Sequence, residues 1–234
     1  MKLIIDIGNT LVKYAVFSFD EIVIIHKKND VEVSFVKDLV QKHSINDVII
    51  SSVRNKTEWD FGLKTLYLDH LTKLPITINY KTPETLGKDR VANVVAASIL
   101  YPNQNALIID AGTCITIDFI DQNKEYQGGR ISPGIEMRYK SLHKFTSQLP
   151  KLCINNNAQQ IGKDTNSSII SGVENGVVAE IETIIIDFKN ENDNLCVIVT
   201  GGDTFFFENT LKNIIFADQN LVLKGLNEIL KYNE

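Results

Sequence analysis

The 234-residue sequence has few of the residues that build disulfide frameworks and metal centres. Its three cysteines, Cys114, Cys153 and Cys196, have no near partners in the sequence. Its four histidines are scattered, and no two have the i, i+4 spacing of a zinc-binding helix. We therefore expect neither a structural zinc site nor a histidine-centred nucleophile, and we interpret the cysteines as buried free thiols of a cytoplasmic protein.

The sequence also lacks long apolar runs and an excess of basic charge. Only three apolar residues separate Lys2 from Asp6, too few for a secretion signal, and no run approaches the roughly 20 residues of a membrane span. The 24 basic residues are outnumbered by 29 acidic ones, which gives a net charge of -5 and disfavours a nucleic-acid-binding face. We expect an unprocessed cytoplasmic protein without a nucleic-acid or membrane partner. A small basic pocket for one phosphorylated ligand stays compatible with this charge.

No linker rich in proline, glycine or serine divides the chain, so its elements are predicted from local patterns. Apolar stretches predict strands at residues 3–6, 14–19, 48–53, 76–80, 106–110, 115–119, 195–200 and near 214–216. Besides a short helix after residue 203, apolar spacing and end signals predict helices at residues 30–43, 63–71, 89–100, 135–145, 167–188 and 220–232. This mixture of strands and helices is typical of an α/β fold.

An internal repeat makes the fold prediction more specific. LIIDIGNT, residues 3–10, and LIIDAGT, residues 107–113, align residue for residue through the glycine, and predicted strands flank each copy. The two copies stand about half the chain apart. They predict two similar halves, residues 1–104 and 105–234, that face each other across a ligand-binding cleft.

The acid–glycine turns have the chemistry of a metal–phosphate site. Glycine allows a tight turn and a close approach of backbone to ligand, and successive N–H groups in such a turn form an anion-binding nest. Asp6 and Asp110 would repel phosphate, but they can bind a cation that bridges to it. Lys13 could neutralise a phosphate oxygen. A single copy of this motif would also suit a plain hairpin turn.

A third segment has a similar character. VIVTGGD, residues 197–203, is an apolar strand that ends in paired glycines, against which a flat group could lie. Alone, it could also be a strand-to-helix turn with Asp203 as the N-cap. Together with the two turns, it resembles the nucleotide-binding core of the actin, Hsp70 and sugar-kinase superfamily, whose fold is ribonuclease H-like. That resemblance implies two halves around a nucleotide cleft.

Further segments resemble one family of this superfamily. They are ETLGKDRVANVVAA (84–97), GGRISPGIEMRYKSLHKFTSQLP (128–150) and IGKDTNSSIISGVENG (161–176). In this order, after DIGNT, they are similar to the type III pantothenate kinase family, and the resemblance runs from Asp6 to about Asp203. It implies ATP-dependent phosphorylation of pantothenate, the first step to coenzyme A. It also implies Mg²⁺ with ATP, a monovalent cation (K⁺ or NH₄⁺) and a homodimer.

The resemblance also implies roles for residues at matching positions. Asp89 would accept the proton of the substrate alcohol. The implied pantothenate contacts are Tyr80, Gly87, Lys88, Asp89, Arg90 and Thr165. The implied ATP contacts are Asp6, Ile7, Gly8, Asn9, Thr10, Leu11, Val12, Lys13 and Thr113. The implied metal ligands are Asp110 and Asp6.

The residue chemistry agrees with these roles, although plainer interpretations exist. A carboxylate such as Asp89 suits a base, and the planar fork of Arg90 suits a substrate carboxylate. Asp89 could instead be the N-cap of its helix, Arg90 part of a surface ion pair, and Tyr80 an aromatic at a strand end. We interpret Pro133–Gly134 as backbone that lies close to the substrate or to the second turn and opens the next helix.

Two residues depart from the family pattern, and the role of one predicted helix depends on the structure. Cys114 stands where alanine is more usual, and Asp164 stands where asparagine is more usual, which adds negative charge beside Thr165. The predicted helix 167–188 is apolar on more than one face. It is either a dimer interface or a central core helix.

Two rival functions have the same fold. One is a non-catalytic regulatory relative, which the intact Asp6, Asp89, Arg90 and Asp110 argue against. The other is an enzyme with a different substrate, such as a kinase for another small alcohol or a polyphosphate-cleaving phosphatase. The GKDR and GGRISPG segments argue against it. A filament former like actin would need a longer chain.

Overall fold

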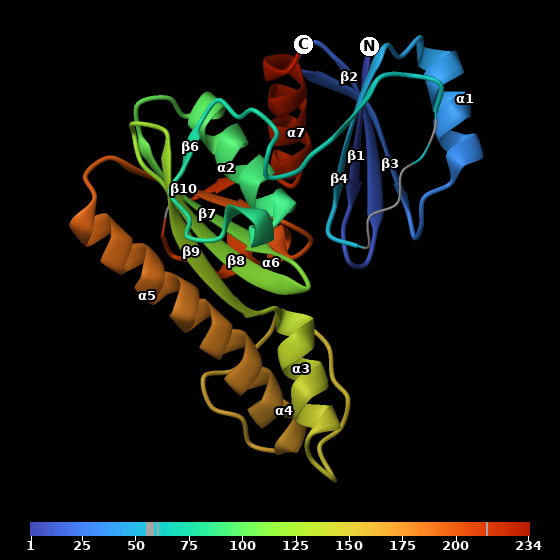
Figure 1. Ribbon diagram of the computed structural model, residues 1–234. Coiled ribbons are helices and arrows are strands. Elements are labelled where there is room, and N and C mark those ends of the chain that lie inside the picture. The colour runs from blue at the N-terminus through green and yellow to red at the C-terminus, as the bar shows by residue number, and fades with distance from the viewer. Residues whose placement is uncertain (55–58, 60, 214) are drawn as a thin grey trace. The chain divides into compact units, whose positions relative to one another are not determined.

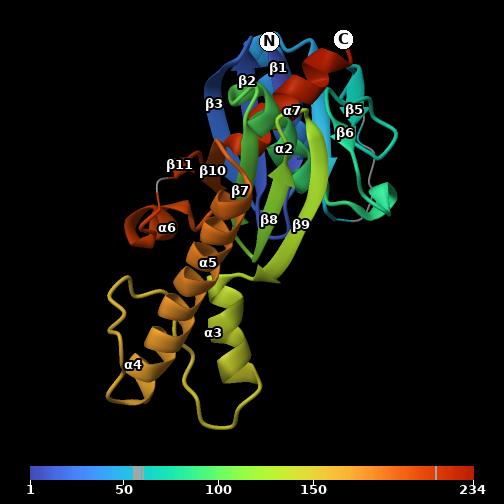
Figure 2. The same ribbon diagram turned by 90° about the vertical axis from the view of Figure 1, so that its left-hand side faces the viewer.

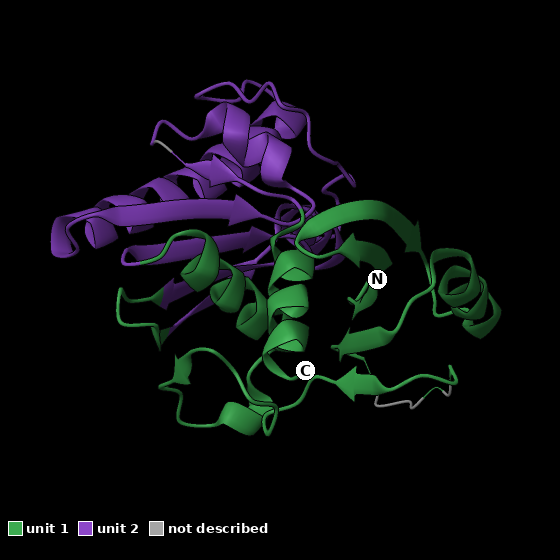
Figure 3. Ribbon diagram, turned by 90° about the horizontal axis from the view of Figure 1, so that it is seen from above, with its two compact units in different colours: residues 1–102, 120–127, 220–234 green, residues 103–119, 128–219 purple. Residues whose placement is uncertain are grey.

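Figure 1 shows the computed structural model, which describes residues 1–54, 59, 61–213 and 215–234. The described chain forms two compact units. Unit 1 comprises Met1–Pro102, Ile120–Gln127 and Asn220–Glu234, and unit 2 comprises Asn103–Phe119 and Gly128–Gln219 (Figure 3). The chain enters unit 2 near the predicted boundary between residues 104 and 105, and two later segments belong to unit 1. The division into two functional halves stays a prediction.

Within the described residues, a five-stranded sheet forms the centre of unit 1. Its order is β3 (Glu21–Lys28), β2 (Val12–Ser18), β1 (Lys2–Ile7), β4 (Asp47–Ser52) and β5 (Thr65–Tyr67). β1 pairs antiparallel with β2 and parallel with β4, and as an inner strand it is almost wholly buried. This position explains its apolar LII run. The same register sets Asp6 opposite Lys13 of β2 and opposite Ser51 of β4.

Helices α1 (Val33–His43), α2 (Lys88–Leu100) and α7 (Leu221–Tyr232) also belong to unit 1. α2 and α7 pack side by side (Figures 1 and 2), and α7 also contacts β1 and β4. Gly225 permits this approach, because a Cβ there would overlap the carbonyl of Ala92. The helix that opens with GKDR therefore has a fixed place in unit 1.

The second sheet of the described chain has the order β11-β10-β7-β8-β9-β6. β6 (Thr77–Ile78) pairs with Glu125 and Tyr126 of β9, and these residues all belong to unit 1. In unit 2, β10 pairs parallel with β7 and with β11, and Thr200 lies opposite Asp110. The bounds of these strands are β7 (Asn105–Ala111), β8 (Cys114–Ile120), β9 (Glu125–Pro133), β10 (Leu195–Thr200) and β11 (Phe216–Ala217).

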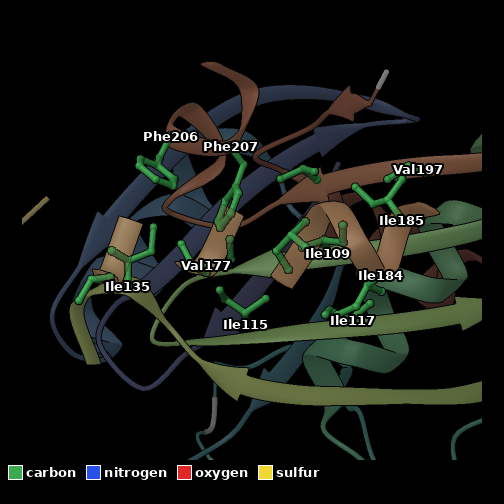
Figure 4. Packing of buried hydrophobic residues seen from close by; sticks show 14 of the residues in the cluster. Ile109, Ile115, Ile117, Ile135, Val177, Ile184, Ile185, Val197, Phe206 and Phe207 are labelled. Carbon is green, nitrogen blue, oxygen red and sulfur yellow. The ribbon is translucent and has the colours of Figure 1, made fainter. Parts of the chain in front are cut away.

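Helices of unit 2 cover a core that the second sheet supplies. Figure 4 shows Ile109 and Ile115 of that sheet packed with Val177 and Ile184 of α5 and with Phe207 of α6. The helices are α3 (Ile135–Lys144), α4 (Thr165–Ile170), α5 (Gly176–Glu191) and α6 (Thr204–Thr210). A π-helical turn, Ser171–Asn175, joins α4 to α5. None of the described helices combines the length and apolar character that a bilayer span needs.

Most predicted elements are confirmed with small changes at their ends. The predicted helix 63–71 is wrong: residues 65–67 form β5, which extends the sheet beside β4. β3 and β9 were not predicted. The predicted strand near residues 214–216 agrees with β11 at Phe216, whereas Ile214 lies outside the described residues. The three cysteines are free thiols as predicted, but the prediction of burial holds only for Cys196, because Cys114 is partly exposed and Cys153 is exposed.

Candidate active site

The first acid–glycine turn joins β1 to β2 in unit 1. The Gly8 N–H donates to the Leu11 carbonyl at 3.0 Å, which folds the loop back on itself. A Cβ at Gly8 would lie 3.2 Å from the same oxygen, so a glycine relieves crowding there. The side chains of Asn9 and Thr10 are exposed at the tip. This is the tight, accessible loop that the sequence predicts.

The remaining residues of this loop divide into charged and apolar ones. Asp6 is almost buried, at 8% exposure, and lies directly across the hairpin from the partly exposed Lys13. Ile7 and Val12 are buried in the core of unit 1. Any ligand contact that these two predicted residues make must therefore come from their backbone groups.

A residue outside the predicted set also contacts this loop. The Arg54 guanidinium donates from Nε to the Gly8 carbonyl at 2.8 Å and from Nη2 to the Asn9 carbonyl at 3.4 Å. Arg54 lies two residues after the end of β4, at a sequence separation of 46 from Gly8. Sequence reasoning missed Arg54, because no local pattern links it to the loop.

The second acid–glycine turn joins β7 to β8 in unit 2. The Gly112 N–H donates to the Cys114 carbonyl at 2.9 Å, and the Thr113 carbonyl accepts from the Gly134 N–H at 3.3 Å. A Cβ at Gly134 would overlap the carbonyl oxygens of Gly112 and Thr113. The prediction that Pro133–Gly134 lies against this turn and opens α3 is confirmed. The side chain of Thr113 is exposed.

The TGGD segment meets the same turn within unit 2. Gly201 has a φ of +95°, and a Cβ there would lie 2.5 Å from Oδ1 of Asp110. The Asp203 N–H donates to the Ala111 carbonyl at 2.9 Å. These contacts bring Asp110 and the paired glycines together, at the carboxyl ends of the parallel strands β7 and β10.

Asp203 occupies the N-cap position of α6, but its side chain makes no capping hydrogen bond. Burial, and then the carboxylate of Glu136, raise the pKa of the Asp203 carboxyl above its ordinary value. The plain capping interpretation therefore accounts for its position in the chain but not for its side chain.

The GKDR segment forms the start of α2. Gly87 is the N-cap residue, and Asp89 lies in the first turn, so the interpretation of Asp89 as the N-cap is wrong. Oδ1 of Asp89 accepts from the Arg90 N–H at 2.9 Å. A Cβ at Gly87 would lie 2.6 Å from this oxygen, so a larger residue there would displace the Asp89 carboxylate from this position. The Asp89 side chain is partly exposed at the helix N-terminus, where negative charge is favoured.

Arg90 is buried, so its interpretation as part of a surface ion pair is wrong. Its Nη2 donates to the Tyr126 hydroxyl at 2.7 Å. Its guanidinium carbon lies 5.8 Å from the ring centre of Tyr80, and the rings of Tyr80 and Tyr126 lie 6.0 Å apart. The structure thus joins two predicted substrate residues through Tyr126, which sequence reasoning missed.

A cavity of about 330 Å³ lies in unit 1 next to this segment. One predicted site residue, Lys88, lines this cavity. Glu84, which is not a predicted site residue, lines it as well. Most of the other lining residues are apolar: Ile50, Trp59, Tyr67, Leu68, Leu74, Ile78, Pro83, Leu86 and Val91. A largely apolar cavity with a few charged groups is typical of a small-molecule site.

Thr165, the last predicted substrate contact, is the exposed first residue of α4. Asp164 before it is the N-cap, and it accepts from the Ser167 N–H at 2.9 Å while the Ser167 hydroxyl accepts from the Asp164 N–H at 3.1 Å. These interactions with Ser167 lower the pKa of Asp164. The charge of Asp164 therefore has a structural role in starting the helix.

No group of three or more His, Cys, Asp or Glu side chains that could hold a metal ion occurs among the described residues. The predicted ligands Asp6 and Asp110 lie in different units. Each supplies a carboxylate at a strand end, which suits a hard cation that takes its other ligands from carbonyls, water or phosphate. Their assignment as metal ligands stays a prediction.

The predicted helix 167–188 corresponds to α4, the π-helical turn and α5. Its apolar residues are mostly buried in the core of unit 2: Ile169, Val173, Val177, Ile181, Ile184 and Ile185. The core-helix interpretation is therefore confirmed for these residues. Ile186 is 48% exposed and remains available for an interface.

Comparisons with known proteins identify the family to which the chain belongs. The family model for type III pantothenate kinase matches residues 2–187. A type III pantothenate kinase of Bacteroides fragilis (strain YCH46) is 43% identical to this chain over 239 residues, which cover 100% of this chain and 98% of the relative.

Solved structures at lower identity support the fold. A conserved Baf family protein of Campylobacter jejuni, which carries the name transcriptional activator, has a TM-score of 0.62 at 23% identity and covers 99% of this chain and 98% of its own. A glucokinase from an Antarctic psychrotroph has a TM-score of 0.54 at 12% identity, with 100% and 99% covered. At these identities the likeness concerns the fold alone, which is the α/β fold of the sugar kinases.

Proposed function

We propose, because the chain belongs to the type III pantothenate kinase family, that it transfers the γ-phosphoryl group of ATP to the primary alcohol of pantothenate. This is the first step towards coenzyme A. The observation that carries the proposal is the start of α2, where a partly exposed Asp89 precedes a buried Arg90 that Tyr126 holds. The two side chains differ in exposure and charge, as a base and a substrate anchor should.

Asp89 acts as the proton acceptor in this proposal. The substrate hydroxyl gives its proton to the Asp89 carboxylate while its oxygen bonds to the γ-phosphorus, and the bond between this phosphorus and the β–γ bridging oxygen breaks to release ADP. Gly87 supports this role, because it leaves room for the carboxylate over the helix N-terminus. General-base help of this kind is worth about 10² to 10⁴ in rate.

Arg90 binds the carboxylate of pantothenate, for which its planar guanidinium is suited. Tyr126 orients the guanidinium through its hydroxyl, and Tyr80 adds a ring face beside it. Lys88 and the apolar cavity beside it support a small, partly apolar substrate. Gly87 and Thr165 complete the proposed set of substrate contacts.

The β1–β2 loop, Asp6 to Lys13, binds the ATP phosphates, and Thr113 makes a second ATP contact. The exposed loop tip and the cation of Lys13 support this assignment. Phosphoryl transfer by a kinase uses ATP with a divalent metal, here Mg²⁺, which neutralises charge that develops on the phosphates. Asp110 and Asp6 would supply carboxylate oxygens to Mg²⁺ or to a monovalent cation, K⁺ or NH₄⁺.

A homodimer and a cytoplasmic location complete the proposal. The exposed Ile186 on α5 and Ile131 on β9, at 48% and 66% exposure, would supply apolar area for a second copy. A kinase that uses ATP works where ATP is abundant, and thiols as exposed as Cys153 persist in a reducing compartment.

ADP release with ATP, Mg²⁺ and pantothenate, in potassium and then in sodium buffer, tests the reaction. We expect pantothenate-dependent turnover that is faster in potassium and that falls by about 10² or more in Asp89→Asn. Asp38→Asn, an exposed aspartate on α1, is the matched control and should keep full activity. Asp110→Asn should reduce the preference for potassium.

The rival functions predict different results in the same assay. A folded protein without turnover in either salt would contradict the kinase proposal and favour the non-catalytic regulatory relative. Turnover with another small alcohol, but not with pantothenate, would keep the fold and the base and change the substrate. Full activity of Asp89→Asn would contradict the role of Asp89 alone.

A further inference from the structure

Arg54 lies two residues beyond the end of β4, and the proposed reaction gives it no role. Its backbone is held firmly: the Val53 N–H donates to the Ile7 carbonyl at 3.1 Å, and the Arg54 N–H donates to the Ser52 hydroxyl at 3.1 Å. These bonds place the start of the Arg54 side chain beside the end of β1. From there the side chain reaches the β1–β2 loop.

The guanidinium of Arg54 connects two loops of unit 1. Its Nε and Nη2 donate to the carbonyls of Gly8 and Asn9 in the β1–β2 loop, at 2.8 and 3.4 Å. Its Nη2 also donates to the Asn29 carbonyl at 3.2 Å, and its Nη1 lies 3.4 Å from Oδ1 of Asp30. Asn29 and Asp30 lie between β3 and α1, so Arg54 connects the β1–β2 loop to a second segment.

The two carbonyl contacts determine how the loop's peptide groups face. A trans peptide group holds its C=O and N–H on opposite sides. The Gly8 carbonyl shares a peptide group with the Asn9 N–H, and the Asn9 carbonyl shares one with the Thr10 N–H. Because both carbonyls point at Arg54, the N–H groups of Asn9 and Thr10 point away from it. Consecutive N–H groups directed to one side form an anion-binding nest.

We propose that Arg54 is a positioning residue, which holds the N–H groups of Asn9 and Thr10 in the orientation that binds the phosphates of ATP. The proposal rests on the proposed function of the β1–β2 loop. Its described hydrogen bonds run from Nε, Nη1 and Nη2 to protein oxygens, so they support a role in orienting the loop. Charge-assisted bonds to the carbonyls also polarise these peptide groups and strengthen their N–H donors.

The geometry favours arginine over lysine. Two neighbouring carbonyls accept from Nε and from Nη2, which the planar guanidinium holds at a fixed spacing. A lysine ammonium is a point charge on a flexible chain and would not hold both peptide planes. Arg54→Lys therefore keeps the positive charge and removes the fixed spacing of the two donors, so it measures the two contributions separately.

Calorimetric titration with MgATP tests the proposal on the full chain. For Arg54→Ala, we expect binding about 10- to 100-fold weaker than for the wild type, since hydrogen bonds to charged groups are lost on the loop. Arg54→Lys should recover only part of the loss. Asp30→Asn, which keeps its oxygen acceptor, and Lys37→Ala, which removes one exposed positive charge of the same unit, should bind within about twofold of the wild type.

Steady-state kinetics add results that general destabilisation would not produce. Arg54→Ala should raise the KM for ATP and leave the KM for pantothenate unchanged, and added guanidinium ion should restore part of the ATP affinity. Equal loss for both substrates, without rescue, would overturn the proposal. If Arg54→Ala does not fold, the KM values for ATP and for pantothenate are compared in Arg54→Lys instead, and a rise for ATP alone supports the proposal.

The proposal and the function it rests on fail in different ways. Wild-type protein that binds MgATP, together with Arg54 variants of unchanged affinity, would overturn only the role of Arg54. Wild-type protein that does not bind MgATP would overturn the phosphate-loop assignment, and the role of Arg54 with it. Binding of MgATP without pantothenate turnover would leave Arg54 in its role and contradict the substrate.

Discussion

The two acid–glycine turns have nearly the same sequence but are held in different ways. In the β1–β2 loop, the Arg54 side chain contacts the carbonyls of Gly8 and Asn9. In the β7–β8 turn, backbone packs against backbone, through Gly134 and Gly201. A repeated motif therefore fixes the local turn but not its surroundings. We expect changes in the second turn to affect stability and changes in the first to affect ligand binding.

The largest expected effect is on the second turn. In Gly134→Ala, the new Cβ would overlap the carbonyl oxygens of Gly112 and Thr113, which are backbone atoms that cannot rotate away. Overpacking of this kind should lower the free energy of unfolding by about 3 kcal/mol. Gly201→Ala should behave similarly, because Gly201 also has a φ of +95°.

Urea unfolding measures this loss, and hydrogen exchange of the β7–β8 amides locates it. Gly176→Ala is the matched control, since nothing lies within 4 Å of its Cβ position and alanine favours the helix. It should keep or raise the stability, by up to about 1 kcal/mol. A Gly134→Ala protein as stable as Gly176→Ala would contradict the role of backbone packing.

A smaller effect on stability is expected at the first turn. Arg54→Ala removes contacts of a side chain that is 30% exposed, so the free energy of unfolding should fall by only about 1 kcal/mol. The same variant should lose much of its ATP affinity. A loss of stability equal to that of Gly134→Ala would remove the difference between the two turns.

The next effect concerns pH and the TGGD segment beside the second turn. In the native protein, burial raises the pKa of the Asp203 carboxyl above its ordinary value. In the unfolded chain, an aspartate has a pKa of about 3.9. Between these two pKa values the native protein keeps a proton that the unfolded chain has lost, so stability falls as pH rises through this window and is level above it.

Asp203→Asn should abolish this dependence, and should be at least as stable as the wild type at pH 7. Urea unfolding at a series of pH values from 4 to 8 gives the two curves. If the unfolding free energies of the wild type and Asp203→Asn change in parallel across this pH range, Asp203 does not cause the pH dependence.

The smallest effect is expected at Asp164, outside both turns. Asparagine also caps helices well, so Asp164→Asn should leave the melting temperature unchanged. It removes a negative charge next to Thr165, so the KM for anionic pantothenate should fall modestly. An unchanged KM would indicate that Thr165 lies far from the bound substrate.

Local patterns predicted the parts of the fold whose residues are close in sequence. The β1–β2 hairpin and α2 follow from short apolar runs and a helical stripe, and both are confirmed. The segment around Leu66 has apolar residues at helical spacing, yet it pairs with Ile49 of β4 as β5. Pairing along a sheet edge overrides a weak local preference. β9, which was not predicted, contains Gly128 and Gly129, and paired glycines weaken a local strand pattern.

The candidate site was predictable only as far as motifs extend. The sequence indicates Asp89 and Arg90 because they stand in a recognisable segment. It does not indicate Tyr126, which is 36 residues from Arg90, or Arg54, which is 46 residues from Gly8. Such partners depend on which strands lie side by side, and one sequence does not reveal that.

The packing of α7 on α2 has a consequence for the order in which the protein is made. α2 carries Asp89 and Arg90, and its close neighbour α7 is formed by residues 221–232. Gly225 presses against Ala92, so α2 lacks part of its packing until these residues have left the ribosome. A nascent chain of about 200 residues would hold every predicted site residue, but its α2 would still lack the packing of α7. The full packing of α2 should therefore form only after residues 221–232 have been translated.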